Sequence, residues 1–273
     1  MDKSKCKSPI ALCLLILSLF ACSVPTSIAD EDDQSQGDNH WQADVDEIKQ
    51  ITQGLKIPGH LIDPESEPTE ALFDPNQLLR PLEHLSLQPG YTLDFVYKFD
   101  GSGGRPYLYA RKTSDTPFEN VDAFQTSLEA CKKENPQGGC HYYEFIDIDG
   151  TPEGYFQWIL LRMMGDQFYL YWHAGYNDKE IIASQARLEE LVNRLKNGES
   201  GVPISETKSR QALKLDPLPK ITIQEENVTL RILWFTKWGG FTESIYTITT
   251  AAPHRIIDQQ DTLLLEYDCG ILF

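Results

Sequence analysis

Residues 91–98 are Tyr91-Thr92-Leu93-Asp94-Phe95-Val96-Tyr97-Lys98. Large apolar side chains at every second position predict a β-strand with one buried face. A turn-forming segment, residues 100–104, follows, and a second strand-like segment spans residues 106–111. The three segments together predict an antiparallel β-hairpin.

Further strands are expected on both sides of the chain's midpoint. Their shared signal is a short stretch rich in apolar, aromatic and β-branched residues, bounded by turn residues. The predicted strands span residues 141–148, 155–163, 168–173, 181–183, 220–224, 228–235, 241–249 and 262–267. Those at 155–163 and 168–173 are expected to be joined by a turn at Gly165.

Three helices are predicted from apolar residues at helical spacing. The first spans residues 40–53. The second begins at the capping-box sequence that starts at Thr116 and reaches Cys131, and the third begins after Ser184 and ends at Gly198. We therefore predict an α+β fold, in which an antiparallel sheet predominates and two or three helices pack on one face. Residues 40–216 would form this domain, with 217–273 as a C-terminal β segment of the same domain.

The first 21 residues have the organisation of an export signal. Lys3, Lys5 and Lys7 precede an apolar segment, residues 9–20, which is too short to span a bilayer. Leu19-Phe20-Ala21-Cys22 follows, and this segment resembles a bacterial lipoprotein signal. The resemblance implies cleavage before Cys22 and acylation of that cysteine, for example with palmitate. An ordinary secretory signal, cleaved after Ala29, is the alternative.

Residues 22–39 are predicted to be a flexible acidic tether, because they are polar and lack apolar periodicity. Ser23 stands where an aspartate commonly marks retention in the inner membrane. The lipoprotein resemblance therefore implies a lipid-anchored protein of the cell envelope, at the outer membrane and facing the periplasm. Such a chain would be attached to the membrane by its acyl groups alone.

The chain is strongly acidic, with a formal charge of −17. Removal of residues 1–21 takes away three lysines and one aspartate, which leaves −19. This charge disfavours binding to nucleic acids, whose phosphates it repels, and would speed the encounter with a cationic protein partner. Simple solubility is the alternative explanation.

Three cysteines remain beyond the signal and Cys22. Cys131 and Cys140 flank a segment with Asn-Pro and Gly-Gly turn signals, and an exported protein meets an oxidising compartment. We therefore predict a disulfide between them and a buried free thiol at Cys269. The cysteines lack the paired spacing of a zinc site, and no cofactor is expected.

The sequence contains only weak candidates for a catalytic or metal site. Asp147 and Asp149 lie beside a turn, as calcium ligands do, but the other ligand positions of a calcium loop are not all filled, so we expect no metal. His173 and Asp178 are possible acid–base residues. Aromatic residues around them form either a binding groove or, more simply, core: Tyr142, Tyr143, Tyr155, Phe156, Trp158, Tyr169, Tyr171 and Trp172.

Two functions agree with these observations. The first is a non-enzymatic envelope lipoprotein that binds a protein partner or has an assembly, structural or immunity role. The alternative is a membrane-tethered hydrolase or carbohydrate-binding enzyme with its site near His173 and Asp178. The absence of a complete catalytic motif from the sequence favours the first.

Overall fold

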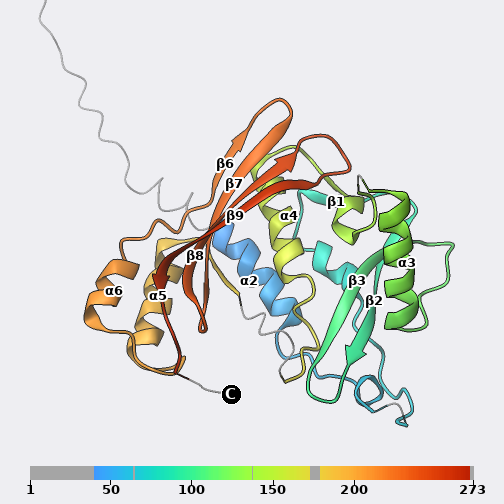
Figure 1. Ribbon diagram of the computed structural model, residues 1–273, viewed down its shortest axis with the longest axis horizontal. Helices are drawn as coiled ribbons and strands as arrows, with labels where there is room; N and C mark the ends of the chain where they lie inside the picture. Colours follow the sequence, from blue (N-terminus) through green and yellow to red (C-terminus); the bar gives the residue numbers. More distant parts are fainter. Residues whose placement is uncertain (1–39, 64, 137, 173–178, 271–273) are drawn as a thin grey trace, which may run out of the picture.

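A five-stranded antiparallel sheet organises the computed structural model, which describes residues 40–63, 65–136, 138–172 and 179–270 (Figure 1). Its strands are β5 (Glu180–Ile182), β6 (Lys220–Ile223), β7 (Asn227–Thr236), β8 (Gly240–Thr249) and β9 (Ile256–Glu266). β7 pairs with β5, β6 and β8, and β8 pairs with β9. The predicted α+β class with antiparallel sheet is confirmed.

The predicted hairpin forms a separate two-stranded sheet. β2 (Tyr91–Phe99) pairs with β3 (Gly104–Lys112) along its whole length, from Tyr91 opposite Lys112 to Phe99 opposite Gly104. In the turn, the Asp100 carboxylate accepts hydrogen bonds from the backbone N–H groups of Ser102 and Gly103. The alternating sequence and the turn residues therefore predicted this hairpin correctly, and the structure adds its register.

The helix α3 (Val121–Glu134) covers one face of this hairpin, where Val96, Tyr109 and Phe124 pack together. The helix begins later than the capping-box sequence at Thr116 predicts. Asn120 is the N-terminal cap instead, because its side chain accepts a hydrogen bond from the N–H group of Ala123 at 2.9 Å.

The strand predicted at residues 155–163 is wrong, because these residues belong to the helix α4 (Pro152–Met164). Thr151 caps this helix and accepts a hydrogen bond from the N–H group of Gly154, and Pro152 occupies the first helical position. Nearly all of its side chains are buried, so the segment lacks the polar face that distinguishes a surface helix from a buried strand.

The helix α2 (His40–Thr52) packs on α4, as Figure 1 shows near the centre of the molecule. Val45 and Ile48 of α2 join the main core with α4, and this core also contains Val228, Leu230, Ile232, Tyr246 and Ile248 of the large sheet. These two helices therefore lie on one face of the sheet.

The opposite face of the sheet carries α5 (Gln185–Lys196) and α6 (Glu206–Ala212). Because side chains alternate along β7, Leu233 and Phe235 point away from α4 and pack with Leu188 and Leu191 of α5. The cap at Ser184 is confirmed, since its hydroxyl accepts a hydrogen bond from the Arg187 N–H group. The polar segment that follows α5, residues 197–216, contains α6.

The remaining elements are short. Residues 141–148, predicted as one strand, form the 3-10 helix η3 (Tyr142–Phe145) and the strand β4 (Ile146–Ile148), which pairs with β1 (Leu85–Leu87). Of the predicted strand 168–173, the described part makes only an isolated bridge between Tyr171 and Gly104. The proline-rich segment between α2 and β1 contains two further 3-10 helices, η1 (Gly59–Leu61) and η2 (Pro75–Leu79). None of the described helices has both the length and the apolar character to cross a bilayer.

Candidate functional site

Three residues predicted from the sequence as functional lie outside the described part of the chain. They are Cys22, the predicted lipidation site, and His173 and Asp178, the possible acid–base residues. Their roles stay predictions.

The predicted disulfide between Cys131 and Cys140 is present, with the two Cα atoms 5.8 Å apart. It joins the last turns of α3 to the segment that leads into η3. Cys269 is a buried free thiol, as its place near the end of the last strand predicts. The cysteines therefore serve the structure in this part of the chain.

The two weak metal candidates have different protein partners. Asp147 in β4 accepts a hydrogen bond from the Gln88 side chain at 3.2 Å. Asp149 lies beyond the end of β4 and accepts a hydrogen bond from the Thr151 hydroxyl at 2.6 Å. Over the described ranges, no group of three or more His, Cys, Asp and Glu side chains is arranged to hold a metal ion.

Asp149 also forms a pair with His84 that the sequence did not predict, because 65 positions separate the two residues. His84 Nδ1 lies 2.7 Å from Asp149 Oδ2. This hydrogen bond raises the pKa of His84. A backbone hydrogen bond joins the same two segments, since the Asp149 N–H group donates to the His84 carbonyl. The His84 N–H group donates to the side-chain oxygen of Gln157 in α4. We interpret the pair as a structural contact between the turn before β1 and the start of α4.

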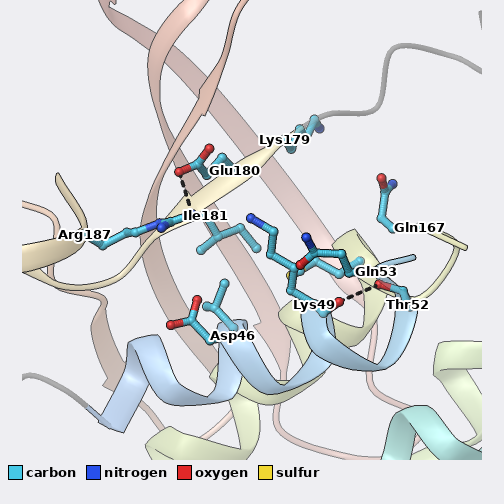
Figure 2. Close-up of a pocket in the computed structure, with 11 residues that line it drawn as sticks. Asp46, Lys49, Thr52, Gln53, Gln167, Lys179, Glu180, Ile181 and Arg187 are labelled. Atoms are coloured by element: carbon cyan, nitrogen blue, oxygen red, sulfur yellow. Dashed lines mark hydrogen bonds and ion pairs between the residues drawn. The ribbon is translucent and has the colours of Figure 1, made fainter. Parts of the chain in front are cut away.

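The main candidate site is an open pocket of about 340 Å³ where α2, β5 and the start of α5 meet (Figure 2). Its apolar lining comes from Val45, Met164 and Ile181. The charged and polar lining comes from the surrounding elements: Asp46, Lys49, Thr52, Gln53, Gln167, Lys179, Glu180 and Arg187. The volume lies at the lower end of the range of pockets that hold small ligands or a few side chains.

The sequence of α2 explains how the helix presents polar groups to this pocket. Asp46, Lys49 and Gln53 are spaced three and four residues apart, so they form one stripe along the helix. This stripe lies beside the buried stripe that contains Val45 and Ile48. Figure 2 shows the Lys49 side chain rising from α2 into the pocket. The stripe was visible in the sequence, but the surface that faces it was not.

One hydrogen bond places α2 against the strand that forms the other side of the pocket. The Gln42 side-chain oxygen accepts it from the backbone N–H group of Ala183, at 2.9 Å and in a buried position. Ala183 follows β5 directly, and 141 positions separate it from Gln42. The pocket therefore depends on a tertiary contact and not on either element alone.

An ion-pair network forms the rim of the pocket on the side of α5. Glu180 pairs with Arg187 at 2.9 Å and also with Arg194, and Glu190 pairs with Arg187 at 2.6 Å. Only 14% of the Arg187 side chain is exposed. Burial opposes its charge, but Glu180 and Glu190 raise the pKa of the guanidinium group. These pairs are partly shielded from solvent, which orders this rim.

The rim also carries cations on its other sides. Lys49 forms no ion pair with any of the described carboxylates. The Lys179 ammonium lies 4.7 Å from the centre of the Trp234 ring. Both lysines therefore add positive charge to the rim of a pocket in an otherwise acidic chain.

A second hollow of about 320 Å³ adjoins the pocket. Asp46 and Arg187 line both cavities, and the second one continues along α2 to Gln42 and along α5 to Ser184 and Glu190. We refer to these two neighbouring cavities, with their shared walls at Asp46 and Arg187, as the groove between α2 and the start of α5.

Four of the eight aromatic residues considered as a possible groove lie in the core instead. Phe156 and Trp158 are fully buried, and Tyr155 and Tyr169 are almost so. The Trp158 N–H group donates to the Tyr143 carbonyl at 2.8 Å, which satisfies its polar atom inside the core. The core interpretation is therefore confirmed for these four residues.

Comparisons of the chain with models of protein families, with curated proteins and with solved structures find no match.

Proposed function

We propose that the chain is a bacterial envelope lipoprotein that binds a protein partner and is not an enzyme. In this proposal, acylated Cys22 attaches it to the outer membrane, and residues 22–39 tether the folded part in the periplasm. The basic and apolar residues ahead of Cys22 support the attachment. A cationic partner would be attracted by the net negative charge of the chain.

The observation that carries the binding role is the composition of the groove between α2 and α5. Apolar side chains of Val45, Met164 and Ile181 line its deeper part, and charges of both signs surround them. An apolar side chain of the partner would lose contact with water there, while the rim would fix the orientation of the flanking residues. Interfaces commonly have this division between an apolar centre and a polar rim.

The lining itself favours binding over covalent chemistry. Among the described residues that line the larger pocket, none is a serine, cysteine or histidine. Of these described lining residues, Thr52 alone has a hydroxyl group, and it donates to backbone carbonyls of α2. This arrangement offers hydrogen bonds and charge to a partner but no activated nucleophile.

The attachment is tested by intact mass of the protein extracted from bacterial membranes. Cleavage before Cys22 with added acyl chains is expected, and Cys22→Ala is expected to release the folded part into the soluble fraction. A mass that corresponds to cleavage after Ala29 without lipid would contradict the lipoprotein assignment.

The binding site is tested with a photo-crosslinking amino acid placed at Gln53, an exposed residue of the pocket lining. We expect one dominant adduct with an envelope protein after irradiation of intact cells. The matched control places the same group at Gln50, which is exposed on α2 but does not line this pocket. Equal adducts from both positions, or none from Gln53, would contradict the proposal.

Charge reversal gives an independent test of the same surface. Lys49→Glu is expected to lower the yield of the Gln53 adduct several-fold, because it changes a charge on the rim. Lys56→Glu, at an exposed position beyond α2, makes the same charge change outside the pocket and is expected to leave the yield unchanged.

A further inference from the structure

A second surface, separate from the groove, is the outer edge of β9. β8 pairs with one side of this strand, and no strand in the described part of the chain pairs with the other side. Residues 257–264 are all exposed, so neither face of the strand is covered there. Figure 1 shows β9 running along β8 towards the end of the sheet where α5 and α6 lie. The unpaired N–H and C=O groups of such an edge can pair with another strand.

Two irregularities set the length of this edge. The register with β8 shifts near Ile257 and again near Leu264. Between these shifts, residues 258–263 pair regularly with residues 247–242 of β8. Six residues of extended strand span about 20 Å. Beyond them, the Lys208 ammonium donates to the Glu266 carbonyl at 2.8 Å, which occupies the end of the strand nearest α6.

The side chains along the edge are acidic and apolar. Asp258 and Asp261 are exposed within the regular part, and Glu266 is exposed at its end. Ile257 exposes 60% of its surface and Leu263 exposes 55%, so both apolar side chains are available for contact. β9 contains none of the lysine, arginine or proline residues that commonly block the edges of natural sheets.

We propose that residues 258–263 of β9 bind an extended, cationic segment of a partner protein, which adds to the sheet as a further strand. Its backbone would pair with the free edge of β9. Its lysine or arginine side chains would lie near Asp258 and Asp261, and its apolar side chains would contact Ile257 and Leu263. Backbone pairing provides affinity in this mode of recognition, and the side chains provide selectivity.

A second copy of the chain fits this edge less well than a cationic strand does. Pairing of β9 with β9 would bring together two strands that each carry Asp258, Asp261 and Glu266. Each chain also has a formal charge of −17 before any cleavage. Like charges on neighbouring strands are destabilising, whereas opposite charges stabilise the pair.

The test measures fluorescence anisotropy of a labelled synthetic peptide, Val-Lys-Val-Thr-Lys-Val-Thr, against the full chain in detergent. Its two lysines are three positions apart and so lie on opposite faces of a strand, as Asp258 and Asp261 do in the regular part of β9. Binding is expected at low salt and is expected to weaken at least five-fold between 50 and 300 mM salt, because it depends partly on charge. A peptide with glutamate in place of both lysines is expected not to bind. Equal binding of the two peptides would overturn the proposal.

Backbone pairing is tested by changes to the peptide and to the strand. Methylation of alternate backbone nitrogens of the peptide leaves the protein unchanged and is expected to weaken binding more than ten-fold. In the protein, Gln259→Pro and Gln260→Pro each remove one N–H group, and alternation directs one of these towards β8 and the other outwards. Loss of an N–H group that points towards β8 should lower the melting temperature, whereas loss of one that points outwards should not. The variant that keeps the parent melting temperature therefore lacks an outward N–H group, and we expect it to lose peptide binding.

Matched variants assign the charge effect to the edge. Asp258→Asn is expected to weaken the lysine peptide several-fold at low salt, whereas Asp122→Asn, at an exposed position of α3, is expected to have no effect. Gln53→Trp, which obstructs the groove, is also expected to leave peptide binding unchanged. Unchanged affinity of the methylated peptide, or self-association of the chain in place of peptide binding, would overturn the proposal.

Discussion

Gln157 of α4 donates a hydrogen bond from Nε2 to Oδ2 of Asp44 in α2, at 3.0 Å. The Gln157 side chain also accepts a hydrogen bond from the His84 N–H group, so one nearly buried amide links three segments of the chain. The charge of Asp44 is therefore held at the contact between the first helix and the core. Burial raises the pKa of Asp44, and the hydrogen bond from Gln157 opposes this only in part.

Asp44→Asn is expected to stabilise the protein at neutral pH. The folded pKa of Asp44 is raised, so its contribution to stability is present below the unfolded value of about 3.9 and is lost as the pH rises through the folded pKa. The asparagine oxygen can still accept the hydrogen bond from Gln157. We expect a gain of up to about 1 kcal/mol at pH 7, or about 2 to 4 °C in melting temperature.

The gain from Asp44→Asn should disappear near pH 4, which calorimetry at the two pH values would show. The control is Glu70→Gln, which changes an exposed carboxylate and is expected to have no effect at either pH. A loss of stability at pH 7 would mean that the negative charge itself is required at this contact.

The pair of His84 and Asp149 is expected to make stability depend on pH in a different range. The hydrogen bond from Asp149 raises the pKa of His84 above the unfolded value of 6.5. The stabilisation is therefore complete below about pH 6.5 and is lost as the pH rises through the folded pKa. The His84 side chain is 34% exposed and the Asp149 side chain is 42% exposed. Solvent screening therefore limits the stabilisation to less than about 1 kcal/mol.

His84→Gln, compared with the parent protein, would reveal this dependence. The difference in melting temperature should be larger at pH 5.5 than at pH 8.5. His60→Gln is the control, because His60 forms no ion pair with the described residues. An NMR titration that places the pKa of His84 at or below 6.5 would contradict the prediction directly.

Gln42→Ala tests the contact that forms the groove. It removes the acceptor of the buried Ala183 N–H group, and a buried donor without a partner costs about 1 to 3 kcal/mol. We expect this loss in chemical denaturation, together with faster hydrogen exchange at Ala183. Gln50→Ala, at an exposed position of the same helix, controls for helix propensity and is expected to change stability little.

Reduction of the disulfide between Cys131 and Cys140 is expected to destabilise the protein, because the unfolded chain then loses a constraint. The sequence separation is only 9, so the expected loss is modest, about 2 to 3 kcal/mol. The double variant Cys131→Ala with Cys140→Ala should show the same loss without reductant. Cys269→Ala separates this effect from that of the buried free thiol. A reduced protein with an unchanged denaturation midpoint would show that α3 is held by its packing alone.

Local signals in the sequence were sufficient for the hairpin, for α2, for the cap of α5 and for the disulfide. In each case the information lies within a few residues: alternation from Tyr91 to Lys98, the apolar stripe of α2, the hydroxyl of Ser184, and turn residues between two cysteines. These features depend on neighbours in the chain and not on what covers them.

Features that depend on distant segments were decided by tertiary packing. Residues 152–164 are buried on almost all sides, so their sequence did not distinguish a helix from a strand. The groove exists because Gln42 contacts Ala183, and the pair of His84 and Asp149 joins segments 65 positions apart. The local sequence specifies which backbone conformation a segment prefers. Which side chains contact one another across a site depends on how distant segments pack around the core.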